Sequence, residues 1–272
     1  MIYYKEKLMF KNADIYYNHT EKPDRKVDVL SYYFVTEKQK KNYSLVNHFT
    51  ILNDLSKSED ELFSCIQKKT RKIIREAKSE EDISCVTILE PGEYNLSAVN
   101  DFIKFYNSFA QLKNLFSANL KEIEQFVNAK TLCIRAAQKD NEILVMHQLH
   151  VADNRAFGQR SCSLFRNSED HDYIKMISKA NRLLHWDDML YFKKRGFLIY
   201  DLGGWYTGQT DKELLQLNEF KKSFGGEVKQ EYVYKVPVSF LGYLWIFLRS
   251  LKHFFKQNWF NLSRRIKVFI PK

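Results

Sequence analysis

Several features that would assign a function class are scarce or missing in this 272-residue sequence. It has only nine glycines and four prolines, while 44% of its residues are hydrophobic, so we expect a folded chain. The four cysteines form no CxxC pair and have no clustered histidines beside them; they are Cys65, Cys85, Cys133 and Cys162. This spacing argues against a zinc site or a disulfide framework. We therefore expect no metal and no permanently bound cofactor.

Two further absences concern the ends of the chain. The first residues, MIYYKEKLMFKNAD, hold no apolar run long enough for a signal peptide, so we expect a cytoplasmic protein. No acidic residue follows Glu231, although eight basic ones do: Lys235, Arg249, Lys252, Lys256, Arg264, Arg265, Lys267 and Lys272. Of the net charge of +10, these leave only +2 for the rest of the chain. The basic character therefore belongs to the tail.

The spacing of apolar residues predicts a mixed fold, α/β or α+β, in three segments: 1–94, 95–238 and a tail over 239–272. One helix is expected over 58–78, opened by the capping-box pattern Ser58-x-x-Glu61. The other expected helices are 97–109, 119–129, 170–194 and one from Thr210 to about Gly225. The expected strands are 27–35, 43–52, 83–89, 131–137, 142–151, 156–165, 197–202 and 231–238.

The stretch GFLIYDLGGWYTG, residues 196–208, carries Asp201 to the end of an apolar strand. Gly203 and Gly204 follow, and glycines let a backbone turn tightly or approach a ligand closely. A structural alternative is that Asp201 caps local amides in the turn. Trp205 and Tyr206 either line a pocket or belong to the core.

The stretch FKKSFGGE, residues 220–227, reads first as the end of a helix. Gly225 is the expected left-handed cap, and Lys221 and Lys222 favour the negative end of the helix dipole. The pair Phe220 and Phe224 has the i, i+4 spacing of ordinary core packing. A site lysine at 221 is the functional alternative.

Three stretches together carry a family resemblance: KKTRKIIREAK (68–78), ANRLLHWDDMLYFKKRGFLIYDLGG (180–204) and FKKSFGGE. In order and spacing they resemble the Fem-type aminoacyltransferases and their relatives in the GNAT-like N-acyltransferase superfamily. The resemblance covers roughly residues 60–237. It implies an abbreviated N-terminal GNAT-like half and a complete C-terminal GNAT-like half.

The resemblance also implies a cytoplasmic acyltransferase that moves an acyl or aminoacyl group onto an amine of a cell-envelope glycan or peptidoglycan precursor. The co-substrate would be an acyl-CoA or an aminoacyl-tRNA, and the acceptor a nucleotide- or lipid-linked amino sugar or peptide. The phosphate-binding signature Q/R-x-x-G-x-G/A of ordinary acetyl-CoA-using GNAT enzymes is missing, so the sequence leaves the donor open.

Direct attack by the amine is expected, because no Ser-His-Asp or Cys-His order is visible. Lys221, which matches the motif lysine, is the candidate for stabilising negative charge or binding a donor phosphate. Asp201, His147 and His150 are the candidate bases, in that order. The two histidines lie three residues apart on an expected strand, so they point to opposite faces and at most one reaches a given cleft.

On the expected 58–78 helix, basic residues recur at i, i+3, i+4 and i+7 and form one stripe: Lys68, Arg71, Lys72 and Arg75. The stripe is either a solvent-exposed face of the helix or a binding site for the phosphates of a nucleotide sugar, a lipid-linked sugar or a tRNA end. The resemblance favours Arg71 and Arg75 as substrate-binding residues.

Residues 240–260, FLGYLWIFLRSLKHFFKQNWF, predict an amphipathic helix whose apolar run ends at Arg249, too short to span a bilayer. A helix lying on an anionic membrane, with Trp245 and Trp259 at headgroup depth, fits this pattern. The protein would then be peripheral on the inner face of the cytoplasmic membrane. Packing on the domain and a dimer contact are the alternatives.

Two rival functions compete with the enzyme. One is a catalytically inactive GNAT-like binding module that recruits envelope precursors or synthases at the membrane. The other is a nucleic-acid-binding protein, suggested by the sequence pI of 9.2. The second is weakened because the charge lies in an aromatic, amphipathic tail and not in a recognised nucleic-acid motif.

Overall fold

The computed structural model describes residues 2–7, 9–17, 23–37, 44–79, 82–164 and 169–251. These residues form two compact units. The larger unit holds residues 48–230, and the smaller unit holds residues 2–47 together with the described residues from Glu231 onward. The chain passes from the smaller unit to the larger within β4 (Ser44–Asp54) and returns within β10 (Glu227–Pro237).

The larger unit is built on a mixed sheet with the strand order β4-β9-β8-β7-β6-β5. Its further strands are β5 (Ser84–Leu89), β6 (Leu132–Lys139), β7 (Glu142–Ala152), β8 (Arg155–Ser163) and β9 (Ile199–Gly204). Strands β6, β7 and β8 are antiparallel neighbours, as the sequence predicts. Strands β8 and β9 pair in parallel, whereas β9 and β4 are antiparallel.

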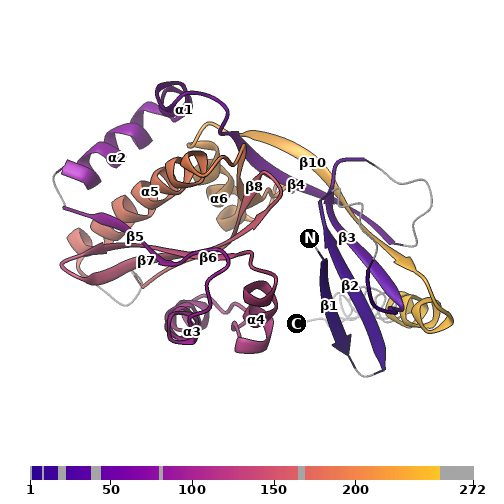
Figure 1. The fold of residues 1–272 in the computed structure, drawn as a ribbon. Coiled ribbons are helices and arrows are strands. Elements are labelled where there is room, and N and C mark those ends of the chain that lie inside the picture. The colour runs from indigo at the N-terminus through magenta and orange to yellow at the C-terminus, as the bar shows by residue number, and fades with distance from the viewer. Residues whose placement is uncertain are drawn as a thin grey trace, which may run out of the picture. The chain divides into compact units, whose positions relative to one another are not determined.

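Helices cover both faces of this sheet (Figure 1). On one face lie α2 (Lys68–Ser79) and α5 (His171–Lys194), and on the other lie α3 (Leu96–Leu112) and α4 (Leu120–Asn128). The core between α5 and the sheet includes Leu144, Leu184, Tyr200 and Phe224, all buried. This burial fixes which face of α5 meets the strands.

The expected helix over 58–78 is two helices, α1 (Glu59–Cys65) and α2, so that prediction is wrong in one respect. The capping box of Ser58 and Glu61 is present as predicted. Ile66 is extended and interrupts the helix. The carbonyls freed at this break are satisfied locally, because Arg71 Nη1 donates to Ser64 O at 2.7 Å and to Ile66 O at 2.8 Å.

Helix α6 (Lys212–Lys222) begins one residue later than its expected cap. Its N-cap is Asp211, whose carboxylate accepts from Leu214 N at 3.1 Å, and not Thr210. Its other end follows the prediction, with Gly225 in the left-handed region at a φ of +81°. A Cβ at position 225 would lie 2.3 Å from Cys65 O, so the position requires glycine for space as well as for conformation.

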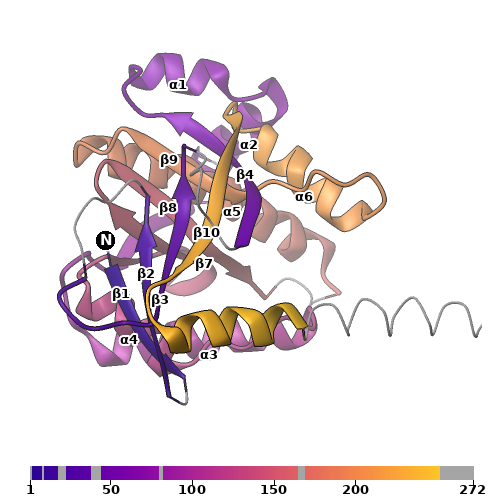
Figure 2. The same cartoon turned by 90° about the vertical axis from the view of Figure 1, so that its right-hand side faces the viewer.

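The smaller unit has the strand order β1-β2-β3-β10, where β1 is Ile2–Lys7, β2 is Phe10–Tyr16 and β3 is Val29–Val35. The sequence predicted β3 but neither β1 nor β2. A helix over residues 240–251 follows β10, and Figure 2 shows it in gold, running across the direction of these strands. The rest of the expected tail helix, residues 252–260, lies outside the described residues.

None of the helices described here is long and apolar enough to cross a membrane. The compact units divide the chain near residues 47 and 230, whereas the expected segments divide it after residues 94 and 238. A compact unit of the structure need not coincide with a GNAT-like half of the chain. The expected segments 1–94, 95–238 and 239–272 therefore stay a prediction.

Candidate active site

A cavity of about 430 Å³ opens in the larger unit where β8 and β9 separate. The parallel ladder between these strands runs only as far as Phe157 and Asp201. The residues just beyond it, Gly158 on β8 and Gly203 on β9, line the cavity. Helices from both faces of the sheet complete it, with Phe109 from α3, Asn181 and His185 from α5, and Leu217, Phe220 and Lys221 from α6.

Gly203 sits where the two strands part, at a φ of +80°. A Cβ at this position would lie 3.1 Å from Gly158 O and 3.8 Å from Lys221 Nζ. The glycine therefore permits a close backbone approach and keeps the space in front of Lys221 open. The predicted close approach of these glycines to a ligand stays a prediction.

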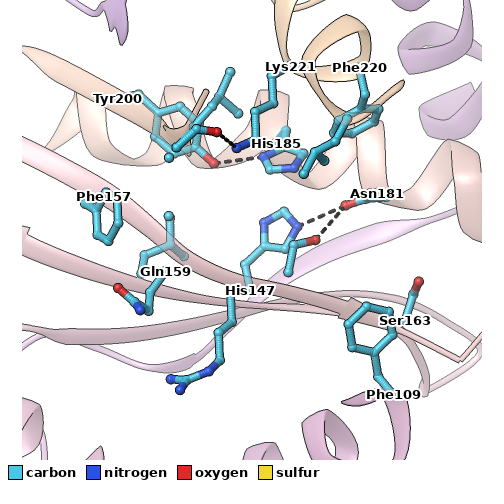
Figure 3. A pocket seen from close by; sticks show the side chains of 18 of the residues that line it. Phe109, His147, Phe157, Gln159, Ser163, Asn181, His185, Tyr200, Phe220 and Lys221 are labelled. Carbon is cyan, nitrogen blue, oxygen red and sulfur yellow. Dashed lines mark hydrogen bonds between the residues drawn. The ribbon is translucent and has the colours of Figure 1, made fainter. Parts of the chain in front are cut away.

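Lys221 enters the cavity from the last turn of α6 (Figure 3). Its ammonium donates to Gly204 O at 2.6 Å, which fixes the end of the long side chain against β9. Burial lowers the pKa of Lys221 to about 8, and the nearby Asp201 carboxylate opposes this shift. The site thus holds a partly desolvated cation with donors available to a ligand.

His147, on β7, lies between α5 and the cavity. Its Nδ1 is 2.7 Å from Asp188 Oδ2, and its Nε2 is 3.0 Å from the side-chain oxygen of Asn181 (Figure 3). A carboxylate accepts only, so Nδ1 carries a proton, and Nε2 is the ring nitrogen on the side of Asn181. The Asn181 amide can serve either state of the ring, because its NH₂ donates to a neutral Nε2 and its oxygen accepts from a protonated one.

Asp188 is fully buried and holds three donors together. Besides His147, the Tyr200 hydroxyl donates to Oδ2 at 3.1 Å, and Arg135 Nη1 lies 3.1 Å from Oδ1. His185 Nδ1 lies 3.0 Å from the Tyr200 hydroxyl. Burial is the main cause that lowers the pKa of His185 well below its ordinary value, so this second histidine is neutral.

His147, His185 and Asp188 offer donor atoms within 4.8 Å of one another, a set able in principle to ligate a metal ion. The arrangement fits a hydrogen-bond network better. His147 Nδ1 and Tyr200 already occupy Asp188 Oδ2, and the Arg135 guanidinium faces the other oxygen. A divalent cation would have to displace these donors beside a fixed positive charge.

Among the described residues, no Asp or Glu lines the cavity, whereas Lys113, Arg160 and Lys221 do. Arg160 is already engaged by Glu122 at 2.7 Å, and Lys113 lies near the end of α3. The cavity therefore favours a neutral or anionic ligand over a cationic one.

Asp201 is the predicted site residue whose surroundings differ most from expectation. It is fully buried and does not line the cavity. Arg155 forms an ion pair with one carboxylate oxygen, and the other accepts from Thr50 Oγ1 and from Gly203 N. Both carboxylate oxygens already accept hydrogen bonds, so Asp201 stabilises the end of the strand. It is badly placed to accept a proton from a substrate.

Four other predicted binding residues lie outside the cavity lining. Trp205 packs partly buried against the core, and the backbone of Tyr206 is held by the Asn218 amide. Arg71 satisfies the break between α1 and α2, and the Arg75 guanidinium lies 5.0 Å from the Phe63 ring centre. Of the predicted set, the cavity brings together Lys221, His147, Gly203 and Gly204.

The two strand histidines face opposite sides, as predicted. His150 packs against Phe126 of α4, and burial lowers its pKa to about 3. The sequence analysis missed Asn181, His185 and Asp188. Their spacing of i, i+4 and i+7 on an otherwise apolar helix face was a signal that could have found them.

No protein-family model matches the sequence, and no curated protein does either. Among solved structures, FemX superposes with a TM-score of 0.64 at 11% identity, over 86% of this chain and 84% of that one. The C-terminal domain of a putative lysylphosphatidylglycerol synthetase from Agrobacterium fabrum gives a TM-score of 0.52 at 11% identity, over 86% and 79%. The mixed α/β fold and the likeness to Fem-type proteins that the sequence predicted are thus confirmed, and the chain has a Fem-like fold.

Proposed function

We propose that this protein is an N-acyltransferase that moves an acyl or aminoacyl group onto an amine of a cell-envelope glycan or peptidoglycan precursor. The observation that carries the proposal is one cavity, opened by the parting of β8 and β9, which presents both Lys221 and a His147–Asp188 pair. The Fem-like fold supports the same reaction class. The identity of the acyl group follows from neither.

In the proposed reaction the acceptor amine attacks the donor carbonyl directly. The new C–N bond forms first and gives a tetrahedral intermediate, and the bond from the carbonyl carbon to the leaving sulfur or oxygen then breaks. The proton lost by the amine passes to His147 Nε2, whose ring is oriented by Asp188, and from there to the leaving group or to water. No covalent acyl-enzyme is needed.

Lys221 has the complementary role. Its ammonium, held against Gly204 O, supplies positive charge for the oxyanion of the tetrahedral intermediate or for a donor phosphate. Both tasks suit a cation in a partly desolvated setting, where charge interactions are stronger than in water. We assign the base to His147 and not to Asp201, because Arg155, Thr50 and Gly203 engage that carboxylate.

The donor is proposed to be an acyl-CoA or an aminoacyl-tRNA, and the acceptor a nucleotide- or lipid-linked amino sugar or peptide. Both donors carry phosphates, which the basic, acid-free lining of the described cavity accommodates. Salt separates them, because tRNA binding falls steeply with added salt and CoA binding falls less. The proposed location is cytoplasmic, peripheral on the inner face of the cytoplasmic membrane, with contact through residues 240–272.

The test is a thermal-shift panel followed by an acyl-transfer assay. The panel holds acetyl-CoA, longer acyl-CoAs, a non-hydrolysable aminoacyl-RNA mimic and nucleotide-linked amino sugars. We expect one donor class to raise the melting temperature of the wild type but not of Lys221→Met, and the same donor to acylate an amine acceptor by mass spectrometry. Binding without turnover for every acceptor amine tried would overturn the enzyme in favour of a binding module.

A further inference from the structure

The helix over residues 240–251 attaches to the smaller unit by a narrow side. Gly242 is the buried residue of this helix, and a Cβ there would lie 2.0 Å from Asp28 O. Gly242 N donates to Ser239 Oγ at 3.1 Å, and Ser239 in turn donates to the Asp28 carboxylate. Trp245 and Ile246, half-buried, continue the attached side.

The opposite side of the helix is apolar and exposed. Phe240 is 82% exposed and Phe247 is 59% exposed. The other exposed apolar residues of this helix are Leu241, Tyr243, Leu244 and Leu248. At 100° per residue, positions 240, 244, 247 and 248 fall on one side, about opposite Gly242. We call the exposed set, from Phe240 to Leu248, the outer face.

This orientation reverses the usual arrangement. A surface helix of a globular unit normally packs its apolar stripe inward and presents its polar side to water. Here Gly242 and the half-buried Trp245 and Ile246 make the attachment, while Phe240, Leu244, Phe247 and Leu248 are exposed on the opposite side. A contiguous exposed apolar surface of this kind marks a site of association.

The charge of the chain after Glu231 indicates which kind of partner binds the outer face. Lys235 Nζ lies 4.8 Å from the Trp245 ring centre and the Arg249 guanidinium lies 5.1 Å from it, so these two basic groups lie on the attached side of the helix and leave the outer face apolar. The chain after Glu231 carries eight Lys and Arg residues and no Asp or Glu. A second copy would bring the same positive charges together, which disfavours self-association. An anionic lipid surface neutralises them and accepts the apolar side chains.

We propose that the outer face docks the protein on a membrane surface that contains anionic phospholipid. Phe240, Leu244 and Phe247 enter the boundary between headgroups and acyl chains, and the excess of Lys and Arg in the sequence after Glu231 attracts the anionic headgroups. The helix lies in the plane of the surface and does not cross it. This inference deepens the proposed membrane location but does not depend on the proposed acyl transfer.

The test is co-sedimentation of the full chain with lipid vesicles. One set of vesicles is pure phosphatidylcholine and the other contains phosphatidylglycerol as well. The variant carries Leu244→Asp and Phe247→Asp, both at exposed positions, so the fold is retained. The matched control is Phe116→Asp, which also removes an exposed phenyl ring but lies 95% exposed in the larger unit.

We expect the wild type and Phe116→Asp to bind the anionic vesicles, with binding weakened by salt. The double variant should bind about tenfold more weakly or worse, since each lost side chain removes apolar burial and adds a negative charge. Equal binding of the double variant, or no vesicle binding by the wild type, would overturn the proposal. A dimer in sedimentation velocity that the double variant abolishes, without vesicle binding, would reassign the outer face to a second copy.

Discussion

His147 Nδ1 and Asp188 Oδ2 lie 2.7 Å apart, joining a strand residue to a helix residue 41 positions later in the chain. The pair is buried, and Arg135 and Tyr200 complete the shell around the carboxylate. One ring nitrogen is thereby committed and the other is directed at Asn181 and the cavity. This division of the two nitrogens is what a positioned general base requires.

The first prediction concerns His147. His147→Gln should lower kcat by about 10²- to 10⁴-fold, because the proton acceptor is lost. The control is His150→Gln, which changes the same residue type on the same strand but on the face that packs against α4. Rates are compared per folded molecule, with folding checked by circular dichroism. Similar losses in both variants would show a structural effect and not a catalytic one.

The second prediction concerns the charge of Lys221. Lys221→Met keeps an unbranched apolar chain as far as the ε position and removes the ammonium, so kcat should fall about 10²-fold or more. Lys222→Met is the matched control, since Lys222 is exposed and donates to Gly226 O at 2.8 Å outside the cavity. A steady-state acyl-transfer assay measures both. An unchanged rate in Lys221→Met would remove this residue from the mechanism.

The third prediction follows from the pKa of Lys221, which burial lowers to about 8 from an ordinary 10.5. Between these two pH values the unfolded chain binds a proton at this position that the folded chain does not. Lys221 therefore makes the free energy of unfolding rise as the pH increases from 8 to 10.5. Urea unfolding across this range should show a smaller rise in Lys221→Met than in the wild type or Lys222→Met. Parallel curves would contradict the lowered pKa.

The same pKa bears on activity. Below pH 8 the ammonium is charged, and above it the neutral amine predominates. The step that uses this cation should therefore slow as the pH rises through about 8. A pH–rate profile in which Lys221→Met lacks the alkaline fall, while Lys222→Met keeps it, would tie that limb to Lys221.

The fourth prediction separates support from catalysis at Asp201. Asp201→Asn removes the carboxylate charge from a buried ion pair with Arg155 and should destabilise the fold by about 3–5 kcal/mol. Asp172→Asn, which breaks an exposed pair with Lys175, should leave stability unchanged. Urea denaturation provides both values. If Asp201→Asn instead abolished turnover at wild-type stability, Asp201 would be the base after all.

The fifth prediction uses two glycines that share a left-handed backbone. Gly225→Ala and Gly92→Ala both place a Cβ at positive φ, which costs roughly 1–2 kcal/mol. Only position 225 adds a clash, with Cys65 O at 2.3 Å, because nothing lies within 4 Å of a Cβ at position 92. Gly225→Ala should therefore lower the melting temperature clearly more than Gly92→Ala. Equal shifts in melting temperature would mean that Cys65 moves away from the new Cβ without a loss of stability.

The sequence predicted most elements because their apolar periodicity is local. It missed the break at Ile66, which depends on bonds from Arg71 and from Gln67 N to Ser223 O. It also missed β1 and β2, two short charged strands that, among the described residues, pair with each other and with β3. Periodicity within one segment carries no information on such pairing.

The candidate site was predictable in part for the same reason. Lys221 and Gly203 stand in motifs that mark helix and strand ends, and these are local signals. The alternative that Asp201 caps a local amide is confirmed by its bond from Gly203 N, but its ion pair could not be predicted, because Arg155 lies 46 positions away and looks like any strand residue in the sequence. Asp188, on α5, could not be recognised from its own segment, because the residues that contact it, His147 and Arg135, lie on β7 and β6.

The segment that bears Lys221 is anchored from far away in the chain. Asn53 Nδ2 donates to Phe224 O at 2.7 Å, and Gln67 N donates to Ser223 O at 2.9 Å, across more than 150 positions. Closing such long loops is entropically costly, so we expect these contacts to form after the local helices and hairpins. Lys221 acquires its desolvated surroundings only when the first and last quarters of the chain have met. A nascent or partly folded chain thus carries an ordinary, fully hydrated lysine at the place where the native protein has its candidate catalytic cation.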